Sequence, residues 1–407
     1  MNIEIIAVGN EILTGFTVNS NAAFISRELL KAGIPTTYHT VGPDRESVTK
    51  KLFAEALQRN RIVISTGGLG PTCDDLTRKW AADLFDSPFV FNREVADDLI
   101  KRYGADLVSL QDQATVPEKA KIMTNTRGTA PGFIFDNGKA TLFLLPGVPA
   151  EMEEMFLHSA LPEILKIWNS KRKILRRFHF SFLTESKVDP ELRVLQKKFP
   201  SLDFGIYPAK GALSVHISGE AGEEPLIEES IEYLRSFFSE YEYFSDSGTI
   251  EEGIHQLFIE SGSTLSIAES CTGGSISARL ASLPGASSYF LGSAVTYSDQ
   301  MKKIFLGVSE EALKTEGAVS RKVVEMMVEG ILRVTGSDYG LAVTGIAGPS
   351  GGTSEKPVGT VWIAVQKKGE PPEVRQLFTR GNRRMIIEYA CNTVLGDLYR
   401  LCRKNFI

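Results

Sequence analysis

The sequence predicts an α/β protein: two three-layer α/β domains with mostly parallel sheets, joined by a small α+β domain. Its 407 residues suffice for two to three domains at roughly 150 residues per domain. Short apolar strands that end in glycine alternate with amphipathic helices near both ends of the chain. Hydrophobic residues make up 43% and charged residues 23%, which is typical of globular proteins and excludes disordered and fibrous classes.

The first domain is expected over 1–170. A buried strand over 3–9 ends in glycine, and in the helix that follows Ala22, Ile25 and Leu29 fall on one stripe. This alternation continues and favours a doubly wound parallel sheet. The remaining expected elements are helices over 19–33 and 46–59, a strand from 61, a helix over 76–85, a strand from 140 and a helix through 151–155.

A middle domain is expected over 171–248. Its first residues, K-R-K-I-L-R-R, most simply form a solvated linker or helix face rather than a nucleic-acid patch. The stretch 178–244 reads as a small α+β unit, and S-D-S-G from Ser245 is typical of a turn.

The α/β alternation resumes in the last domain, over 249–407. A helix over 254–261 precedes a strand over 264–268, and another helix follows S-C-T-G-G. Further buried strands are expected over 293–297, 339–344 and 360–366.

Charge and cysteine content restrict the class further. The formal net charge of −5 makes the chain a poor general nucleic-acid binder. Its four cysteines include no C-x-x-C pair, which argues against zinc and thioredoxin-like sites and fits a reducing compartment. No apolar stretch approaches the roughly 20 residues needed to span a bilayer. We therefore expect a cytoplasmic protein with neither nucleic-acid nor membrane partners.

Three loops of the first domain carry a candidate ligand site: V-G-N-E-I-L-T-G, T-G-G-L-G-P-T-C-D-D-L-T-R and L-P-G-V-P-A-E-M. All follow predicted strands, so they should meet at one carboxyl edge, where open α/β sheets bind ligands. Glycines let the backbone approach a phosphate, and paired aspartates suit a hard divalent cation. Alternatively, the glycines only make turns and the aspartates only cap a helix. The candidate residues are Gly9, Glu11, Gly67, Gly68, Gly70, Asp74, Asp75 and Gly147.

In the last domain, A-E-S-C-T-G-G places Ser270 at a strand-to-helix turn. A hydroxyl there would lie beside backbone N–H groups able to stabilise an oxyanion. A serine nucleophile needs a base, and no histidine follows His255, so a Ser-His-Asp triad drawn from the strands and loops of this domain is excluded. A desolvated lysine, Lys302 or Lys303, could take that role. Two alternatives remain open: Ser270 as a helix cap and Cys271 as the nucleophile.

Two further segments of this domain could bind a ligand. V-T-G-I-A-G-P-S-G-G contains Thr344 and is another strand followed by a glycine-rich loop. G-N-R-R supplies the guanidinium groups of Arg383 and Arg384, which could grip a phosphate or simply begin a solvated helix.

Longer strings in both regions resemble known families. A-E-S-C-T-G-G, V-T-Y-S-x-x-x-K, T-G-I-A-G-P-x-G-G and K-P-V-G-T-V-W-I-A resemble the nicotinamide-nucleotide amidase family. G-G-L-G-P-T-x-D-D-L-T and L-P-G-V-P-A-E-M resemble the molybdopterin-binding-like domain. Both sets, in this order and over essentially the whole chain, resemble the CinA (competence/damage-inducible) family.

The amidase resemblance implies hydrolysis of nicotinamide mononucleotide (NMN) to nicotinic acid mononucleotide and ammonia, without a cofactor. By motif position Ser270 matches the nucleophile, and Lys302 rather than Lys303 matches the base. Tyr297 and Thr344 would orient this pair, amides near Gly273 and Gly274 would hold the oxyanion, and the substrate phosphate would bind an arginine. The implied substrate-binding residues are Gly273, Gly274, Gly345 and Arg383, with Arg384 a less close match than Arg383.

The N-terminal resemblance implies a metal-dependent ADP-ribose pyrophosphatase, with Mg²⁺, Mn²⁺ or Co²⁺ held by Asp74 and Asp75. The middle segment resembles the family's KH-like insert but lacks the G-x-x-G clamp, so RNA binding is not expected. The family resemblance also implies a homodimer. Two other function classes stay open: a non-enzymatic nucleotide-binding module, and a molybdenum-cofactor enzyme that uses the N-terminal site.

Overall fold

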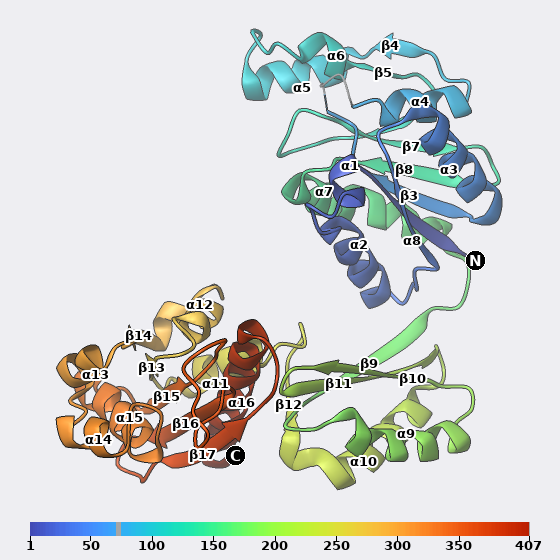
Figure 1. The fold of residues 1–407 in the computed structure, drawn as a ribbon. Coiled ribbons are helices and arrows are strands. Elements are labelled where there is room, and N and C mark those ends of the chain that lie inside the picture. The colour runs from blue at the N-terminus through green and yellow to red at the C-terminus, as the bar shows by residue number, and fades with distance from the viewer. Residues whose placement is uncertain (71–74, 407) are drawn as a thin grey trace. The chain divides into compact units, whose positions relative to one another are not determined.

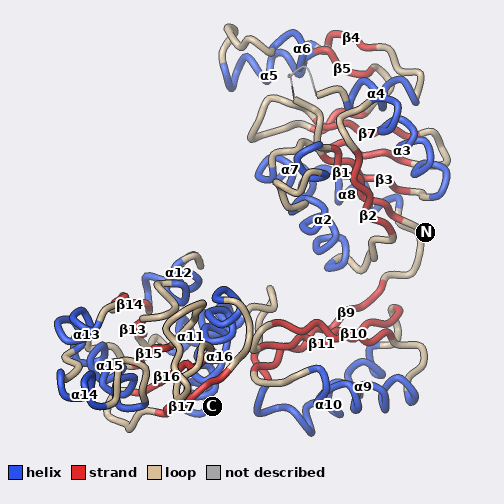
Figure 2. The backbone as a smooth tube through the Cα atoms, in the orientation of Figure 1, coloured by secondary structure: helices blue, strands red, loops and turns tan. Residues whose placement is uncertain are grey.

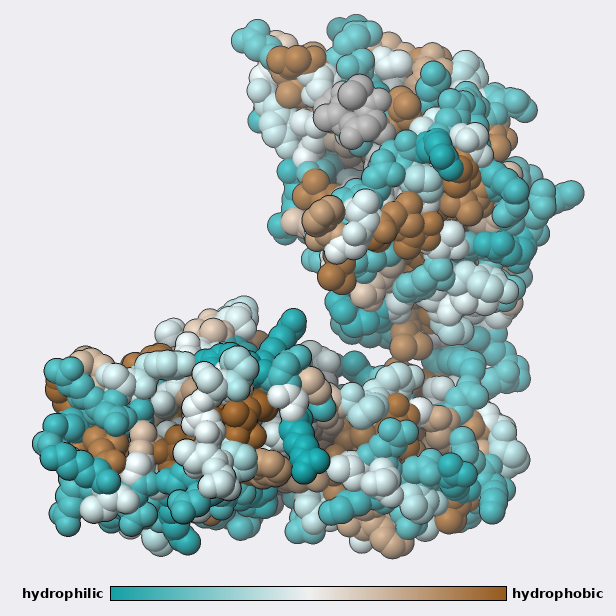
Figure 3. Space-filling view, viewed as in Figure 1, coloured by the Kyte–Doolittle hydropathy of each residue, from teal (hydrophilic) through white to brown (hydrophobic). Residues whose placement is uncertain are grey.

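The computed structural model describes residues 1–70 and 75–406 and divides the chain into two compact units, Met1–Leu175 and Arg176–Ile407. The second unit contains two separate sheets, one built from the middle of the chain and one from its C-terminal part (Figure 1). Within the described residues, no helix combines the length and the apolarity needed to cross a bilayer. On the face shown in Figure 3, hydrophilic residues cover most of the surface and hydrophobic ones are scattered among them.

A six-stranded sheet forms the centre of the first unit, with the strand order β2-β1-β3-β8-β7-β6 (Figures 1 and 2). The first four strands in this order run parallel, and β7 and β6 extend the sheet antiparallel. The strands are β1 Ile3–Val8, β2 Tyr38–Gly42, β3 Ile62–Thr66, β6 Lys121–Met123, β7 Gly132–Asp136 and β8 Thr141–Leu145.

Helices cover both faces of this sheet, and the side chains of β1 alternate between the two apolar cores that result. Ile3 and Ile5 pack with α2, α7 and α8, whereas Ile6 and Val8 pack with α3 and α4. The helices are α2 Ser20–Lys31, α3 Glu46–Arg59, α4 Thr77–Leu84, α7 Pro149–Met155 and α8 Leu161–Ile167. The smaller elements are α1 Asn10–Leu13, β4 Phe89–Phe91, α5 Arg93–Tyr103, α6 Leu110–Ala114, β5 Thr115–Pro117 and the π-helix η1 Phe156–Ala160.

One charged residue lies inside β1. Glu4 is 0% exposed and accepts hydrogen bonds from Arg59 Nε and Nη2, at 2.9 and 2.6 Å, and from Asn60 Nδ2 at 2.6 Å. Thr40 Oγ1 donates a further bond at 2.6 Å. These donors compensate the buried carboxylate, so the strand tolerates a charge in an otherwise apolar run.

The middle of the chain forms a four-stranded sheet in the order β10-β11-β9-β12, packed with two helices (Figure 2). Its β10–β11 hairpin is antiparallel, and β12 pairs antiparallel with β9. The elements are β9 Lys173–Ser181, α9 Glu185–Lys198, β10 Asp203–Ala209, β11 Ala212–Glu220, α10 Glu224–Phe238, the 3-10 helix η2 Ser239–Tyr241, and β12 Glu242–Tyr243.

The prediction that residues 171–177 form a linker or a helix face is wrong, because strand β9 begins at Lys173. The basic run continues within the same strand into the buried Phe178 and Phe180. Its long side chains reach solvent, and the Arg176 guanidinium lies 3.5 Å from the Glu228 carboxylate of α10.

The C-terminal sheet has the order β14-β13-β15-β16-β17, with the first three strands parallel and the last two antiparallel. Helices α11 and α16 share one core with this sheet, and α13 and α15 share the other, which confirms the predicted three-layer class. The strands are β13 Leu265–Glu269, β14 Phe290–Val295, β15 Tyr339–Gly345, β16 Thr360–Lys367 and β17 Glu373–Phe378. The helices are α11 Ile250–Ser261, α12 Ser275–Ala281, the 3-10 helix η3 Ala286–Ser288, α13 Asp299–Leu306, α14 Glu310–Thr315, α15 Arg321–Thr335 and α16 Arg383–Phe406.

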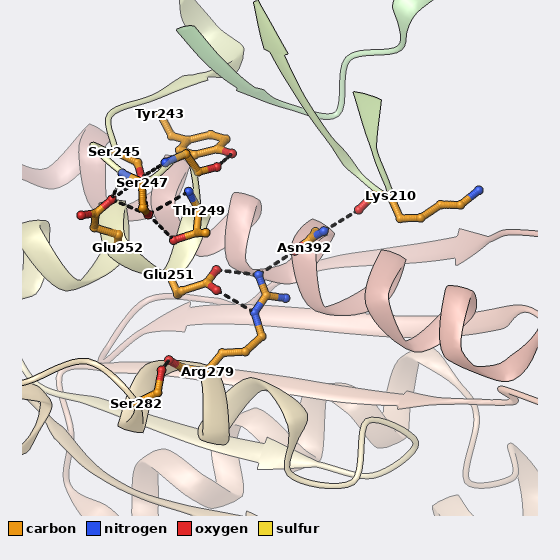
Figure 4. Close-up of polar contacts among 11 residues, drawn as sticks. Lys210, Tyr243, Ser245, Ser247, Thr249, Glu251, Glu252, Arg279, Ser282 and Asn392 are labelled. Carbon is orange, nitrogen blue, oxygen red and sulfur yellow. Dashed lines mark hydrogen bonds and ion pairs between the residues drawn. The ribbon is translucent and has the colours of Figure 1, made fainter. Parts of the chain in front are cut away.

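Polar contacts join the two sheets of the second unit (Figure 4). The Arg279 guanidinium of α12 faces the Glu251 carboxylate of α11, with Nη2–Oε2 2.6 Å. The same Nη2 donates to Asn392 Oδ1 of α16 at 2.7 Å, and Asn392 Nδ2 donates to the Lys210 carbonyl at 2.6 Å. Because Lys210 lies in the turn of the β10–β11 hairpin, these bonds connect that hairpin to α12.

Candidate active site

Ser270 and Lys302 form a buried pair at the carboxyl edge of the C-terminal sheet. Ser270 directly follows β13, and its N–H donates to the Val343 carbonyl of β15 at 3.0 Å. Lys302 lies on α13, which begins after the side-chain cap of Ser298. Its Nζ is 3.1 Å from Ser270 Oγ and donates to the Thr296 carbonyl at 2.9 Å. Ser270 is 7% exposed and Lys302 is 1% exposed, so water has little access to the pair.

Burial decides which groups near this pair can react. It lowers the pKa of Lys302 below the usual 10.5, against the opposing effects of Asp299 and Cys271. It also raises the pKa of the Cys271 thiol to about 12, so the thiol stays protonated near neutral pH. Lys303 points elsewhere, since its Nζ pairs with Glu310 at 3.0 Å. The geometry therefore favours Ser270 over Cys271 as nucleophile and Lys302 over Lys303 as base.

Among the described residues, neither Thr344 nor Tyr297 makes a hydrogen bond to this pair, so the orienting role predicted for them stays a prediction. Thr344 is buried near the end of β15, and its hydroxyl donates to the Ala318 carbonyl at 2.8 Å. Tyr297 is 59% exposed, and its hydroxyl accepts a bond from Arg383 Nη2 at 2.7 Å. Gly345 continues β15 opposite Val361 of β16. These residues share a sheet edge with Ser270 because their strands are neighbours, but their hydrogen bonds run to other groups.

Arg383 lies exposed at the start of α16 and is held by two acceptors. Nη2 donates to the Tyr297 hydroxyl, and Nη1 donates to the Gly348 carbonyl at 2.9 Å. Neither acceptor carries a charge, so the guanidinium keeps its positive charge available for an anionic group. Arg384 makes neither contact.

The amides of Gly273 and Gly274, which were predicted to hold an oxyanion, are not the backbone amides nearest to Ser270 in the sequence. The Gly273 amide donates to the Ser270 carbonyl at 3.1 Å, and the Gly274 amide donates to Glu269 Oε2 at 3.0 Å. Both amides are therefore already engaged. Among the described residues, neither the Cys271 nor the Thr272 amide donates to a backbone carbonyl, and the Cys271 amide faces only its own thiol, so these two amides are the candidate oxyanion donors.

Glu269 lies within the motif A-E-S-C-T-G-G, but it was assigned no role from the sequence. A charged residue at the end of an otherwise buried strand, immediately before the candidate nucleophile, is the signal that could have drawn attention to it.

The three predicted loops of the first unit do meet, around a cavity of about 440 Å³ at the carboxyl ends of β1, β3 and β8. Gly67 has a φ of +107°, and a side chain there would collide with the Val8 carbonyl, so only glycine brings these loops so close. Asp74 lies outside the described residues. The other predicted residues line the cavity: Gly9, Glu11, Gly67, Gly68, Gly70, Asp75 and Gly147.

Carboxylates dominate the charge around this cavity. Glu11, Asp44, Asp75 and Glu151 line it, whereas no Lys or Arg is among its described lining residues. Sequence reasoning missed Asp44, which accepts from the Asn10 amide at 2.9 Å, and assigned no role to Glu151. Oxygen donors of this kind suit a hard divalent cation. Among the described residues, however, no three such side chains come close enough together to hold one, and of the two predicted metal ligands only Asp75 is placed.

Comparisons with known proteins decide the family. Residues 247–402 match the family model "CinA C-terminal domain", and residues 4–166 match "Probable molybdopterin binding domain". A CinA-like protein of Dictyoglomus turgidum is 37% identical over 409 residues, covering 98% of each chain. The CinA-like protein of Nostoc punctiforme is 36% identical, covering 98% of this chain and 99% of its own.

The chain belongs to the CinA family.

A solved CinA structure from Thermoplasma acidophilum is 37% identical, covers 41% of this chain and 98% of its own, and has a TM-score of 0.38. The CinA C-terminal match includes Ser270, Lys302 and Arg383, and the N-terminal match includes all three glycine-rich loops. Neither match includes the middle sheet, so its KH-like character stays a prediction. The homodimer and the cytoplasmic location also stay predictions.

Proposed function

We propose that the C-terminal domain of this CinA-family chain is a serine–lysine amidohydrolase that converts NMN to nicotinic acid mononucleotide and ammonia. The observation that carries the proposal is the buried Ser270–Lys302 pair, with an Nζ–Oγ distance of 3.1 Å. That distance lies within the reach required of a general base. The resemblance of the surrounding motifs to nicotinamide-nucleotide amidases supports NMN as the substrate.

In the first half-reaction, neutral Lys302 takes the proton of Ser270 Oγ. The Thr296 carbonyl accepts one Nζ–H bond and so helps direct the Nζ lone pair toward the serine. Oγ then attacks the carboxamide carbon of the nicotinamide ring and forms a C–O bond, while the carbonyl oxygen becomes an oxyanion. The amides of Cys271 and Thr272 would donate to that oxygen.

The tetrahedral intermediate collapses as the C–N bond breaks. The Lys302 ammonium returns its proton to the leaving nitrogen, so ammonia departs and an acyl ester remains on Ser270. A water molecule next attacks this ester, and Lys302 accepts the water's proton. When Oγ leaves and regains its proton, nicotinic acid mononucleotide is released and the pair is restored.

Arg383 supports the choice of a phosphorylated substrate. Tyr297 and Gly348 fix the guanidinium in place, which lowers the entropy lost when it binds a phosphate. A guanidinium can bind phosphate through two parallel hydrogen bonds, and this favours NMN over free nicotinamide.

Ammonia release from NMN, followed with an enzyme-coupled assay, tests the proposal. We expect release by the wild-type protein and none by Ser270→Ala, with nicotinic acid mononucleotide as the second product. A non-enzymatic binding module would bind NMN without releasing ammonia. A molybdenum-cofactor enzyme would depend on bound cofactor, whereas this amidase should run in its absence.

We propose a second activity for the first domain: metal-dependent hydrolysis of ADP-ribose to AMP and ribose 5-phosphate. The carboxylate-lined cavity of about 440 Å³ supports it, because a diphosphate would be repelled there unless a divalent cation neutralised the charge. Asp75, with Asp74, would hold that cation, which would supply Lewis-acid activation of a phosphoryl oxygen. Formation of AMP only with added Mg²⁺, Mn²⁺ or Co²⁺ is the expected result, and no AMP with any of them would leave this domain a binding module.

A further inference from the structure

Glu269 is a fully buried carboxylate next to the nucleophile. It ends β13, immediately precedes Ser270 and is 0% exposed. Its side chain accepts four hydrogen bonds from the start of α12: the amides of Gly274 at 3.0 Å, Ile276 at 3.3 Å and Ser277 at 2.9 Å, and Ser277 Oγ at 2.5 Å. Among the described ion pairs, Glu269 has no cationic partner. Backbone amides and one hydroxyl therefore compensate its burial.

The backbone of Glu269 is connected to the catalytic base. Its carbonyl accepts a bond from the Thr296 amide at 2.8 Å. The Thr296 carbonyl in turn accepts from Lys302 Nζ at 2.9 Å. One residue thus contacts both the turn that follows the nucleophile and the segment that orients the lysine.

The side chain of Glu269 also determines which amides of that turn remain available. It engages the amides of Gly274, Ile276 and Ser277, whereas among the described residues those of Cys271 and Thr272 donate to no backbone carbonyl, and the Cys271 amide faces only its own thiol. The available amides are the two nearest to Ser270 in the sequence. If the carboxylate were lost, the amides at the start of α12 would need other partners, and the turn carrying the free amides would shift.

We propose that Glu269 is a positioning residue of the amidase, an inference that rests on the proposed function. It fixes the turn from Cys271 to Gly274 so that the amides of Cys271 and Thr272 face the developing oxyanion. The main-chain carbonyl at this position, which any residue would supply, holds Thr296 and through it Lys302. Glu269 does not touch the substrate, so its effect should appear in the transition state and hardly in substrate binding.

The test is Glu269→Gln, which keeps the side-chain volume but turns an NH₂ group toward the amide donors. We expect kcat with NMN to fall about 100-fold, since misplacement by about 1 Å costs that much, while KM changes less than about threefold. Glu4→Gln is the matched control, because Glu4 is also 0% exposed and multiply hydrogen-bonded but lies in β1 of the first unit. It should lower the melting temperature of its own unit and leave kcat unchanged.

A conservative pair of variants distinguishes positioning from general destabilisation. Ser277→Ala removes only the 2.5 Å hydroxyl bond, so kcat should fall a few-fold at an unchanged melting temperature. Glu269→Asp keeps the charge but shortens the reach, and its kcat should lie between those of wild type and Glu269→Gln. If Glu269→Gln does not fold, the Ser277→Ala result decides: wild-type kcat in that variant contradicts the inference.

Labelling with a fluorophosphonate probe separates this inference from the choice of substrate. Ser270 Oγ attacks the phosphorus and fluoride leaves, so the labelling rate reports the nucleophile without NMN. We expect labelling of wild type, none of Ser270→Ala and at least tenfold slower labelling of Glu269→Gln, since about tenfold is a modest part of a preorganised site's effect. Labelling without ammonia release would overturn the proposed substrate alone. Equal labelling rates in wild type and Glu269→Gln would overturn the role of Glu269 alone, and no labelling of wild type would overturn both.

Discussion

The two candidate ligand sites of this chain occupy the same place in their sheets, at the carboxyl edge where parallel strands run into glycine-rich loops. In the C-terminal site a hydroxyl and an amine lie 3.1 Å apart and are almost completely buried. In the N-terminal site the corresponding edge opens into a cavity of about 440 Å³, lined among the described residues by four carboxylates. Both sites lie where glycine-rich loops follow parallel strands, but they differ in the chemistry of their side chains and in their exposure to solvent.

This difference shows what each site needs from outside the chain. In the proposed amidase, Lys302, whose pKa burial has lowered, would supply the base, so the proposed reaction would use only groups of the chain and water. The carboxylates of the first unit repel a diphosphate and would need a cation to accept one. Variants that affect one site and not the other therefore test the comparison.

The largest effect is expected for Lys302→Arg. A guanidinium stays protonated and cannot take the Ser270 proton, so kcat for ammonia release should fall by about 10²- to 10⁴-fold with little change in KM. Lys303→Arg is the control, because Lys303 pairs with Glu310 away from the nucleophile. Near-normal kcat in Lys302→Arg would show that Lys302 is not the base.

The pH dependence of the wild-type enzyme checks the same assignment. As pH falls through the pKa of Lys302, which burial holds below 10.5, the lysine gains a proton and kcat should decline. The unfolded chain binds this proton more tightly, so stability should rise with pH between the folded and the unfolded pKa of Lys302. A kcat that stays flat as the pH is lowered toward 5 would contradict a lysine base.

Arg383→Ala should affect binding instead of chemistry. A lost charged hydrogen bond costs about 1.5–3 kcal/mol, which corresponds to roughly a 10- to 100-fold rise in KM for NMN. Steady-state kinetics should show a smaller decrease in kcat. Arg384→Ala should leave both kcat and KM close to the wild-type values. A larger rise in KM for Arg384→Ala than for Arg383→Ala would show that Arg384 binds the phosphate.

Asp75→Asn should act only on the first unit. We expect AMP formation from ADP-ribose to fall at least about tenfold, because a metal ligand or a residue that orients one is removed. Chelation by EDTA should abolish AMP formation by the wild-type protein, whereas ammonia release should persist under both conditions. Loss of ammonia release on chelation would contradict the claim that only the N-terminal site needs a metal ion.

The smallest effect is expected for Cys271→Ala. With a thiol pKa of about 12, Cys271 is protonated and acts as a small buried apolar group. kcat should stay within about threefold of wild type, because the amide that would hold the oxyanion belongs to the backbone. Complete loss of ammonia release in a well-folded variant would point to Cys271 as the nucleophile.

Much of the fold was predictable because its signals are local. The short buried run of β1, the stripe of Ala22, Ile25 and Leu29, and glycines at strand ends reflect neighbours within a few residues. The basic run at 171–177 led to a wrong prediction. Its charges suggested a linker, whereas strand β9 begins within the run, at Lys173. Strand pairing is decided by distant partners, which a local pattern does not contain.

By itself, the sequence determined the α/β class, the sheet edges that carry ligand loops, and the candidacy of Ser270 and Lys302 in the absence of a nearby histidine. Only the tertiary structure decided that Lys302 rather than Lys303 faces the serine, and that Tyr297 contacts Arg383. It also assigned the Gly274 amide to Glu269, whereas within the described part of the chain the amides of Cys271 and Thr272 donate to no backbone carbonyl. The physical reason is that a hydrogen-bond partner depends on distance in space, and Ser270 and Lys302, 32 residues apart in sequence, meet only when β13 and α13 pack together.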